Sequence, residues 1–253
     1  MDVPPHPHTG LQTVSWLFAG EIEHRDSAGS LALVRPGELN LMTAGHGIQH
    51  SEVSTANAAE LHGTQLWIAL PEASRDMEPF FEHTVPQPIT IGGATARVFV
   101  GALAGTVSAA RVFSPLVGAQ LDLPAGAILA LPVAANFEHG VLLDRGELTV
   151  DGENLPVSNV AFVPAGARFI QLSAGDSGAR ALLLGGSPFE EQIIMWWNFI
   201  GRTHEEIEQY RHDWQLHVIE QTTDSGRFGA VRGYHGSPLP APEMPTVRLK
   251  ARD

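Results

Sequence analysis

Two short histidine-containing pairs near the start of the chain carry its clearest chemical signal. The first pair lies in His6-Pro7-His8 and the second in His50-Ser51-Glu52. The outer residues of each pair are spaced i, i+2, so on an extended strand both side chains point to the same face. If the two strands lie side by side in a β-barrel, three imidazoles and one carboxylate converge on one point. The spacing therefore predicts a divalent transition-metal site made by His6, His8, His50 and Glu52.

The chemistry of this ligand set narrows the choice of metal. Three neutral imidazoles and one carboxylate suit Fe(II), Mn(II), Co(II), Ni(II), Cu(II) or Zn(II), whereas Ca(II) and Mg(II) prefer oxygen ligands. Four protein ligands leave one or two positions free on a five- or six-coordinate ion, while a purely structural zinc site is closed and tetrahedral. The chain has 12 histidines, so one His-x-His pair could arise by chance. The prediction depends on the presence of two pairs in strand-like sequence.

The residues around these pairs predict many short strands. The chain has 253 residues, of which 43% are apolar, 26 are glycine and 18 are proline. Much of the glycine and proline stands between short apolar or β-branched runs, a pattern typical of a barrel or jelly roll. Besides the strand that carries His50 and Glu52, we expect strands at residues 13–18, 21–25, 31–34, 39–43 and 66–70.

A second β-rich block follows an acidic, proline-punctuated stretch, residues 71–88, which we interpret as an exposed connection. After the block, Thr203 and Glu206 form a predicted capping box that starts a short helix ending near Leu216. A Gly- and Pro-rich extended arm follows. The expected domains are 1–88, an N-terminal metal-binding barrel, 89–190, a C-terminal barrel, and 191–253, the helix and arm packing on the barrels. Strands are expected in the second block at 96–101, 110–114, 119–123, 127–131, 140–143, 147–150, 160–163, 168–172 and 179–184.

Composition excludes several classes of function. The net charge is −13, from 15 basic and 28 acidic residues, without a basic run, which argues against direct binding of nucleic acid. The chain has no cysteine, hence no disulfide and no thiolate metal site. No secretory signal is visible, and the longest apolar run, residues 119–137, is interrupted by Asp122, Pro124 and Pro132, so no membrane span is expected. We expect a cytoplasmic protein.

Three motifs give the chain a family resemblance. They are PHPHTGLQTV at residues 5–14, RPGE at 35–38 and MTAGHGIQHSE at 42–52. With them the chain resembles the pirins, which belong to the bicupin branch of the cupin superfamily. The resemblance implies an all-β fold of two cupin (jelly-roll) β-barrels in tandem, with a short C-terminal helix and an extended arm. It also implies one iron, Fe(II), in the N-terminal barrel, held by the four residues that the spacing selects.

The chain departs from the family pattern in three places. Gln12 stands where many cupins have a glutamate, and His46 stands where pirins usually have arginine, at the expected rim of the pocket. Family members normally have a few tens of residues before the His-x-His motif. The first barrel is therefore expected to lack its first strands, and Met1 to be a truncated or misassigned start. In the second block the counterpart of the motif is residues 136–139, with one histidine, and we expect no metal there.

The resemblance implies a metal-dependent dioxygenase of the quercetin 2,3-dioxygenase type, which opens the central ring of a flavonol and releases carbon monoxide. Glu52 would be both a metal ligand and the base that takes the proton of the flavonol hydroxyl. Leu17 and Leu41 would hold the flat rings if they face inward. The alternative is a non-catalytic, iron-dependent redox-sensing regulator that binds a protein partner, and a weaker one is a metal-bound storage or stress protein. Two barrels in one chain favour a monomer.

Overall fold

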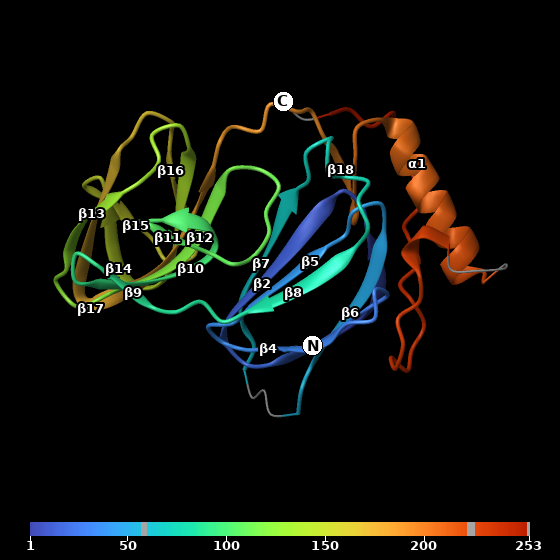
Figure 1. Cartoon of the computed structure of the whole chain (residues 1–253), viewed down its shortest axis with the longest axis horizontal. Helices are drawn as coiled ribbons and strands as arrows, with labels where there is room; N and C mark the ends of the chain where they lie inside the picture. The colour runs from blue at the N-terminus through green and yellow to red at the C-terminus, as the bar shows by residue number, and fades with distance from the viewer. Residues whose placement is uncertain (57–59, 222–225, 252–253) are drawn as a thin grey trace. The chain divides into compact units, whose positions relative to one another are not determined.

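The computed structural model divides the chain into two compact units, the first of which is discontinuous in sequence. Unit 1 comprises Met1–His83 and Glu190–Asp253, and unit 2 comprises Thr84–Phe189. Antiparallel strands dominate both units (Figure 1). No helix within the described part of the chain is long and apolar enough to cross a membrane. The described residues are 1–56, 60–221 and 226–251.

The first sheet of unit 1 carries all four predicted ligands. Its edge strand contains three prolines, which cannot donate to a sheet ladder, and the pairing register shifts between Val3 and His6. The sequence predicts an edge or a bulge for this strand, and both are present. The strands, in their order across the sheet, are β1 (Asp2–His8), β6 (Ile48–Ser54), β3 (Ile22–Asp26) and β4 (Leu31–Val34).

The second sheet of unit 1 faces the first. Gln65 donates to Glu52 from one sheet to the other, and His24 stacks on Phe81 with ring centroids 4.7 Å apart. Side chains of the two sheets therefore fill one interior, as in a jelly roll. The strands, in their order across the sheet, are β7 (His62–Ala69), β2 (Leu11–Ala19), β5 (Leu39–Thr43) and β8 (Phe80–Thr84).

The prediction of an exposed connection over residues 71–88 is wrong in its second half. Strand β8 lies there and pairs beside β5. It forms because Phe81 packs against the buried side chains of Met42, Ala44 and Ile48. The prolines and acidic residues around this apolar pair of phenylalanines conceal the strand in the sequence.

Unit 2 is one nine-stranded antiparallel sheet built on two long strands, β14 and β17. Each long strand spans two of the predicted short strands. In β14 the pairing register with β17 shifts at Leu143/Arg145 and at Gly146/Leu148. The predicted strand at 110–114 is wrong, because a turn held by the Ser108 hydroxyl occupies the start of that segment. The strands are β9 (Ile89–Ile91), β10 (Ala94–Leu103), β11 (Thr106–Val107), β12 (Leu116–Leu123), β13 (Ile128–Pro132), β14 (Glu138–Val150), β15 (Glu153–Leu155), β16 (Val160–Val163) and β17 (Phe169–Gly186).

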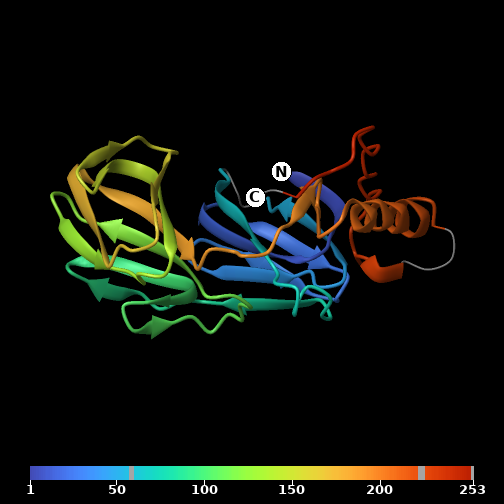
Figure 2. The same ribbon diagram turned by 90° about the horizontal axis from the view of Figure 1, so that it is seen from above.

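The C-terminal segment returns to unit 1 and packs on the outside of its sheets (Figure 2). The Thr203 hydroxyl accepts a hydrogen bond from the Glu206 N–H at 3.2 Å, as the capping box predicts. The periodic residues Ile207, Tyr210 and Trp214 are buried. The elements are β18 (Ile194–Trp196), β19 (Phe199–Gly201), α1 (His204–Asp213), a π-helical turn (Trp214–Ile219) and a 3₁₀ turn (Gly226–Phe228).

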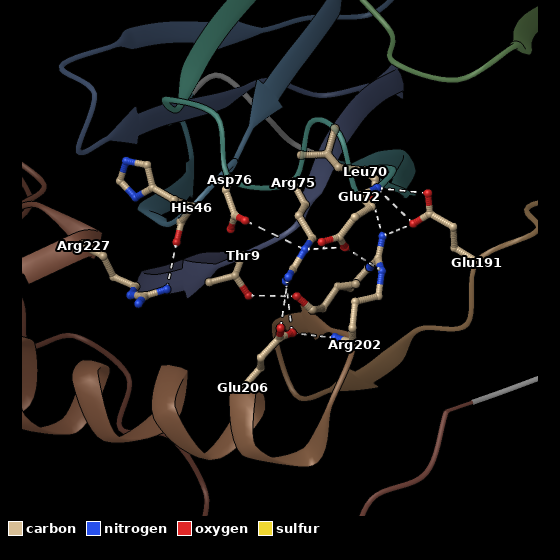
Figure 3. A network of polar contacts seen from close by, with 11 residues as sticks. Thr9, His46, Leu70, Glu72, Arg75, Asp76, Glu191, Arg202, Glu206 and Arg227 are labelled. Carbon is tan, nitrogen blue, oxygen red and sulfur yellow. Dashed lines mark hydrogen bonds and ion pairs between the residues drawn. The ribbon is translucent and has the colours of Figure 1, made fainter.

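A network of ion pairs attaches this returning segment to the loop that follows β7 (Figure 3). Arg75 donates to both carboxylate oxygens of Glu206, each at 3.0 Å, and Arg202 donates to the Leu70 carbonyl at 2.8 Å. Burial alone would lower the pKa of Arg75, but its hydrogen bonds to Glu206 and Glu72 raise that pKa above the ordinary value. The network fixes the segment that supplies the Asn198 carbonyl to the histidine cluster described next.

Candidate metal centre

The three predicted histidine ligands meet inside unit 1. Strands β1 and β6 are antiparallel neighbours, and His6 lies directly opposite His50. One ring nitrogen from each of His6, His8 and His50 lies within 4.8 Å of the others. The three side chains are buried, with exposures between 0 and 7%. The predicted convergence of the two pairs is thus present for the histidines.

Backbone carbonyl groups set the tautomers of two of these histidines. His6 Nδ1 lies 2.9 Å from the Pro4 carbonyl oxygen, and His8 Nδ1 lies 3.2 Å from that of Asn198. A carbonyl oxygen only accepts hydrogen bonds, so each Nδ1 carries the proton and each Nε2 keeps a lone pair. Such an outer partner is typical of a metal-binding histidine.

Burial keeps this cluster uncharged. Desolvation lowers the pKa of His6, and it lowers the pKa values of His8 and His50 well below the ordinary value. Electrostatic repulsion within the group lowers the pKa values of His8 and His50 further. The rings are therefore neutral near pH 7, which is the form that binds metal ions.

The distance between the nitrogens fits a metal ion. Nε2 of His8 and Nε2 of His50 are 3.0 Å apart. Two nitrogens bound at right angles to one ion, each at about 2.1 Å, are separated by about 3.0 Å. The lone pairs of two such nitrogens repel each other unless a proton or a cation lies between them. The donor set therefore suits a divalent transition metal.

Glu52 belongs to a second group that overlaps the first. One carboxylate oxygen of Glu52 lies within 4.8 Å of ring nitrogens of both His24 and His50. Gln65 donates through its side-chain nitrogen to both oxygens of this carboxylate, each at 2.9 Å, and the Ser15 hydroxyl donates to one of them at 3.4 Å. Glu52 is 5% exposed. His50 is the residue common to both groups.

Glu52 and His6 also line a cavity of about 340 Å³, a size that suits a small molecule. The rest of its wall is mostly apolar. Leu17 lines it as expected, whereas Leu41 is fully buried and is not among the lining residues. The other lining residues are Met1, Val3, Ser15, Ile22, Leu61, Gly63, Thr64 and Gln65.

His24 and Asp26 are functional candidates that the sequence interpretation undervalued. The predicted strand at 21–25 contains His24 and stops short of Asp26, and neither residue is among the predicted ligands. In the structure both are buried on β3, and His24 Nε2 lies 3.0 Å from Asp26 Oδ2. The signal was present, because His24-x-Asp26 is a third i, i+2 pair of potential ligands in strand-like sequence.

The two residues that depart from the family pattern have structural partners in unit 1. Gln12 is buried and donates to the Thr43 hydroxyl at 2.8 Å. His46 pairs with the exposed Glu78 at 3.3 Å and is not among the residues that line the cavity. His46 therefore lies at the surface of the protein and not on the wall of this cavity.

The counterpart position in unit 2 is built differently. His139 is buried on β14, and neither of its ring nitrogens has a hydrogen-bond partner among the described residues. Within the described ranges, both groups of three or more potential metal ligands lie in unit 1.

Comparison with known proteins identifies the family. The pirin model matches residues 1–68, and the model of the pirin C-terminal cupin domain matches residues 118–219. A Pseudomonas aeruginosa protein named "Putative quercetin 2,3-dioxygenase" is 43% identical over 244 residues, which are 96% of this chain and 75% of that protein. A pirin-like protein of Caulobacter vibrioides is 36% identical over 249 residues, 96% of this chain and 82% of that protein.

A solved structure extends the likeness to three dimensions. The crystal structure of quercetin 2,3-dioxygenase from Acinetobacter baumannii is 39% identical, with a TM-score of 0.92 over 99% of this chain and 81% of that one. The shared fold, the two family models and the buried histidine group on β1 and β6 agree. The chain belongs to the pirin family of cupin proteins.

Proposed function

We propose that unit 1 is the active site of a quercetin 2,3-dioxygenase-like enzyme that binds one Fe(II) through His6, His8, His50 and Glu52. The observation that carries the proposal is the position of Glu52. Its carboxylate lies next to His50 and also on the wall of the cavity. A substrate in this cavity thus meets a carboxylate and the histidine cluster together. The names of the similar proteins from P. aeruginosa and A. baumannii support the reaction class.

The chain's own groups account for binding and proton transfer. When bound, the metal would act as a Lewis acid that polarises the adjacent hydroxyl and ketone oxygens of a flavonol. Glu52 is the base that takes the hydroxyl proton, and Gln65 holds it by contacting both oxygens. Ser15 donates to one of those oxygens. These contacts hold the carboxylate at the wall of the cavity.

The apolar wall of the cavity would hold the substrate rings and exclude water. Leu17, Ile22 and Leu61 contact the space beside Glu52 and would lie against the flat rings of a flavonol. Apolar walls exclude water and strengthen the electrostatic interactions inside the site. The substrate class that fits is a small aromatic compound with one polar edge, of which a flavonol is an example.

Oxygen uptake with quercetin tests the proposal. The protein is stripped of metal, reloaded separately with Fe(II), Mn(II), Co(II), Ni(II), Cu(II) or Zn(II), and assayed for oxygen consumption and carbon monoxide release. We expect turnover to be highest with Fe(II). Glu52→Gln should lose it, while the matched control Glu78→Gln, at an exposed carboxylate, should keep it. Bound metal without turnover for every ion would contradict the enzyme and favour a non-catalytic regulator that binds a protein partner.

A further inference from the structure

A chain of three buried side chains, one on β6 and two on β3, leads away from the histidine cluster. His50 Nδ1 lies 3.4 Å from His24 Nδ1, and His24 Nε2 lies 3.0 Å from Asp26 Oδ2. His24 is 3% exposed and the Asp26 side chain 0%. The two carbonyl groups that orient His6 and His8 do not reach His50, so another group must set its tautomer.

Asp26 sets the direction in which hydrogen bonds are donated along these three side chains. Its Oδ1 accepts a hydrogen bond from the Ser30 N–H at 2.9 Å in the hairpin between β3 and β4. Its Oδ2 faces His24 Nε2. An ionised carboxylate only accepts hydrogen bonds, so His24 must place a proton on Nε2. The ring is held in this orientation by stacking on Phe81.

The proton position of His24 determines the direction of its hydrogen bond with His50. When His24 is neutral, the proton on Nε2 leaves a lone pair on Nδ1. His50 must then donate from its own Nδ1, which leaves the lone pair on Nε2. That atom faces His8 at 3.0 Å, where the metal is expected.

We propose that Asp26 and His24 are positioning residues that fix His50 in the tautomer with a proton on Nδ1 and so make its Nε2 a metal ligand. The inference deepens the proposed function, because it assumes the metal centre of unit 1. It also assigns His24 a different role from His6, His8 and His50. His24 Nε2 is directed at Asp26, and His24 Nδ1 accepts from His50, so His24 supports a ligand and is not one itself.

Asp26→Asn should reverse the donors and acceptors along these side chains without changing their positions. The Ser30 N–H needs an acceptor, so the asparagine oxygen takes that place and its NH₂ group faces His24. His24 must then accept at Nε2 and carry its proton on Nδ1, directed at His50. His50 is forced to protonate Nε2, which blocks the ligand atom. Loss of an outer partner of a metal-binding histidine typically weakens affinity 10–100-fold, and we expect a loss of about that size here.

Two further variants separate this role from a structural one. In His24→Gln the amide can donate to Asp26 and accept from His50, so the affinity should fall less than about tenfold. In the double variant Asp26→Asn/His24→Phe the chain is broken and His50 is free to choose its tautomer. The double variant should therefore bind metal more tightly than Asp26→Asn alone. A structural role predicts that it binds less tightly.

The experiment is a titration of the metal-free protein with Ni(II) against a chromophoric chelator, together with NMR of ¹⁵N-histidine-labelled protein loaded with Zn(II). We expect the Ni(II) affinities of the variants to follow the order given above, and the control Asp144→Asn in unit 2 should bind as tightly as the wild type. In the wild type the NMR spectra should place the proton of His50 on Nδ1 and that of His24 on Nε2. Wild-type affinity in Asp26→Asn, a double variant weaker than the single one, or His24 protonated on Nδ1 would overturn the proposal. None of these measurements depends on turnover of quercetin.

Discussion

Both units are built from antiparallel strands, but the side chains in their interiors differ in polarity. The cluster of buried side chains between the strands of unit 2 consists of Ala, Val, Leu and Ile. Among the described residues, its buried polar residues are Gln120 and His139, and the Asp144 side chain, 4% exposed, pairs with Arg180. The interior of unit 1 contains many more, and they are His6, His8, Thr9, Gln12, Thr13, Ser15, His24, Asp26, Asn40, Thr43, Gln49, His50, Ser51 and Glu52.

This difference shows which interior is built for stability and which for chemistry. Burying polar groups costs free energy unless hydrogen bonds or charges compensate for it. In unit 1 the cost is offset by partners at both ends of the cluster, such as the Pro4 carbonyl and the Gln65 amide. Unit 2 avoids the cost by packing aliphatic side chains. Four substitutions test the contrast, in decreasing order of expected effect.

Removing the shared ligand should have the largest effect. His50→Ala deletes the residue common to both ligand groups. We expect metal affinity to fall by more than the roughly 100-fold typical of an outer partner, and quercetin turnover to disappear. His139→Ala in unit 2 is the matched control and should keep the full metal content. Metal analysis after gel filtration measures both, and retention of one equivalent by His50→Ala would refute the assignment.

Truncating the core of unit 2 should reduce stability without touching the chemistry. Leu131 is fully buried in the aliphatic cluster. Leu131→Ala should lower the free energy of unfolding by about 2–5 kcal/mol, because it leaves a cavity. Urea denaturation measures the loss, and the metal content of the folded protein should not change. Loss of metal in the folded variant would mean that the two interiors do not act separately.

Weakening the ion-pair network tests the dependence of unit 1 on the returning segment. Arg75→Met removes the donor of two hydrogen bonds to Glu206. Hydrogen bonds to charged groups contribute about 1.5–3 kcal/mol, so we expect a loss of that size in urea denaturation. Arg248→Met, at an exposed ion pair with Glu205, should cause no measurable loss. Equal effects of the two variants would show that the network does not hold the segment.

A pH series should reveal the smallest effect, at His139. Burial lowers the pKa of His139 below the ordinary value of 6.5. The unfolded chain therefore binds a proton at a higher pH than the folded one, and the stability present above about pH 6.5 declines as the pH falls. His139→Leu should remove this decline, so its advantage over the wild type should grow on acidification. Parallel stability curves for the two proteins between pH 7.5 and pH 5 would contradict the prediction.

Sequence patterns reveal much of this arrangement because strands position residues by a simple alternation. The i, i+2 spacing in His6-x-His8 and His50-x-Glu52 was enough to predict which side chains share a face. The aliphatic alternation that builds unit 2 is equally visible. By contrast, strand β8 could not be recognised among the prolines and acidic residues around it, since its formation depends on packing of Phe81 in the finished fold.

Hydrogen-bond partners that lie far away in the sequence could not be predicted from local sequence patterns. His8 donates to the carbonyl of Asn198, 190 residues away, and no local pattern marks that contact. Gln65, which holds Glu52, lies on β7 but just outside the predicted strand at 66–70. These outer partners depend on how the sheets and the returning segment meet, so they follow from the tertiary structure.

The most direct test of the account is an anomalous-diffraction map of crystals of the Ni(II)-loaded protein, collected at the nickel edge. We expect one peak per chain, between the Nε2 atoms of His6, His8 and His50 and beside the Glu52 carboxylate. A peak bound instead to Nδ1 of His24, a peak in unit 2, or no peak within unit 1 would contradict it.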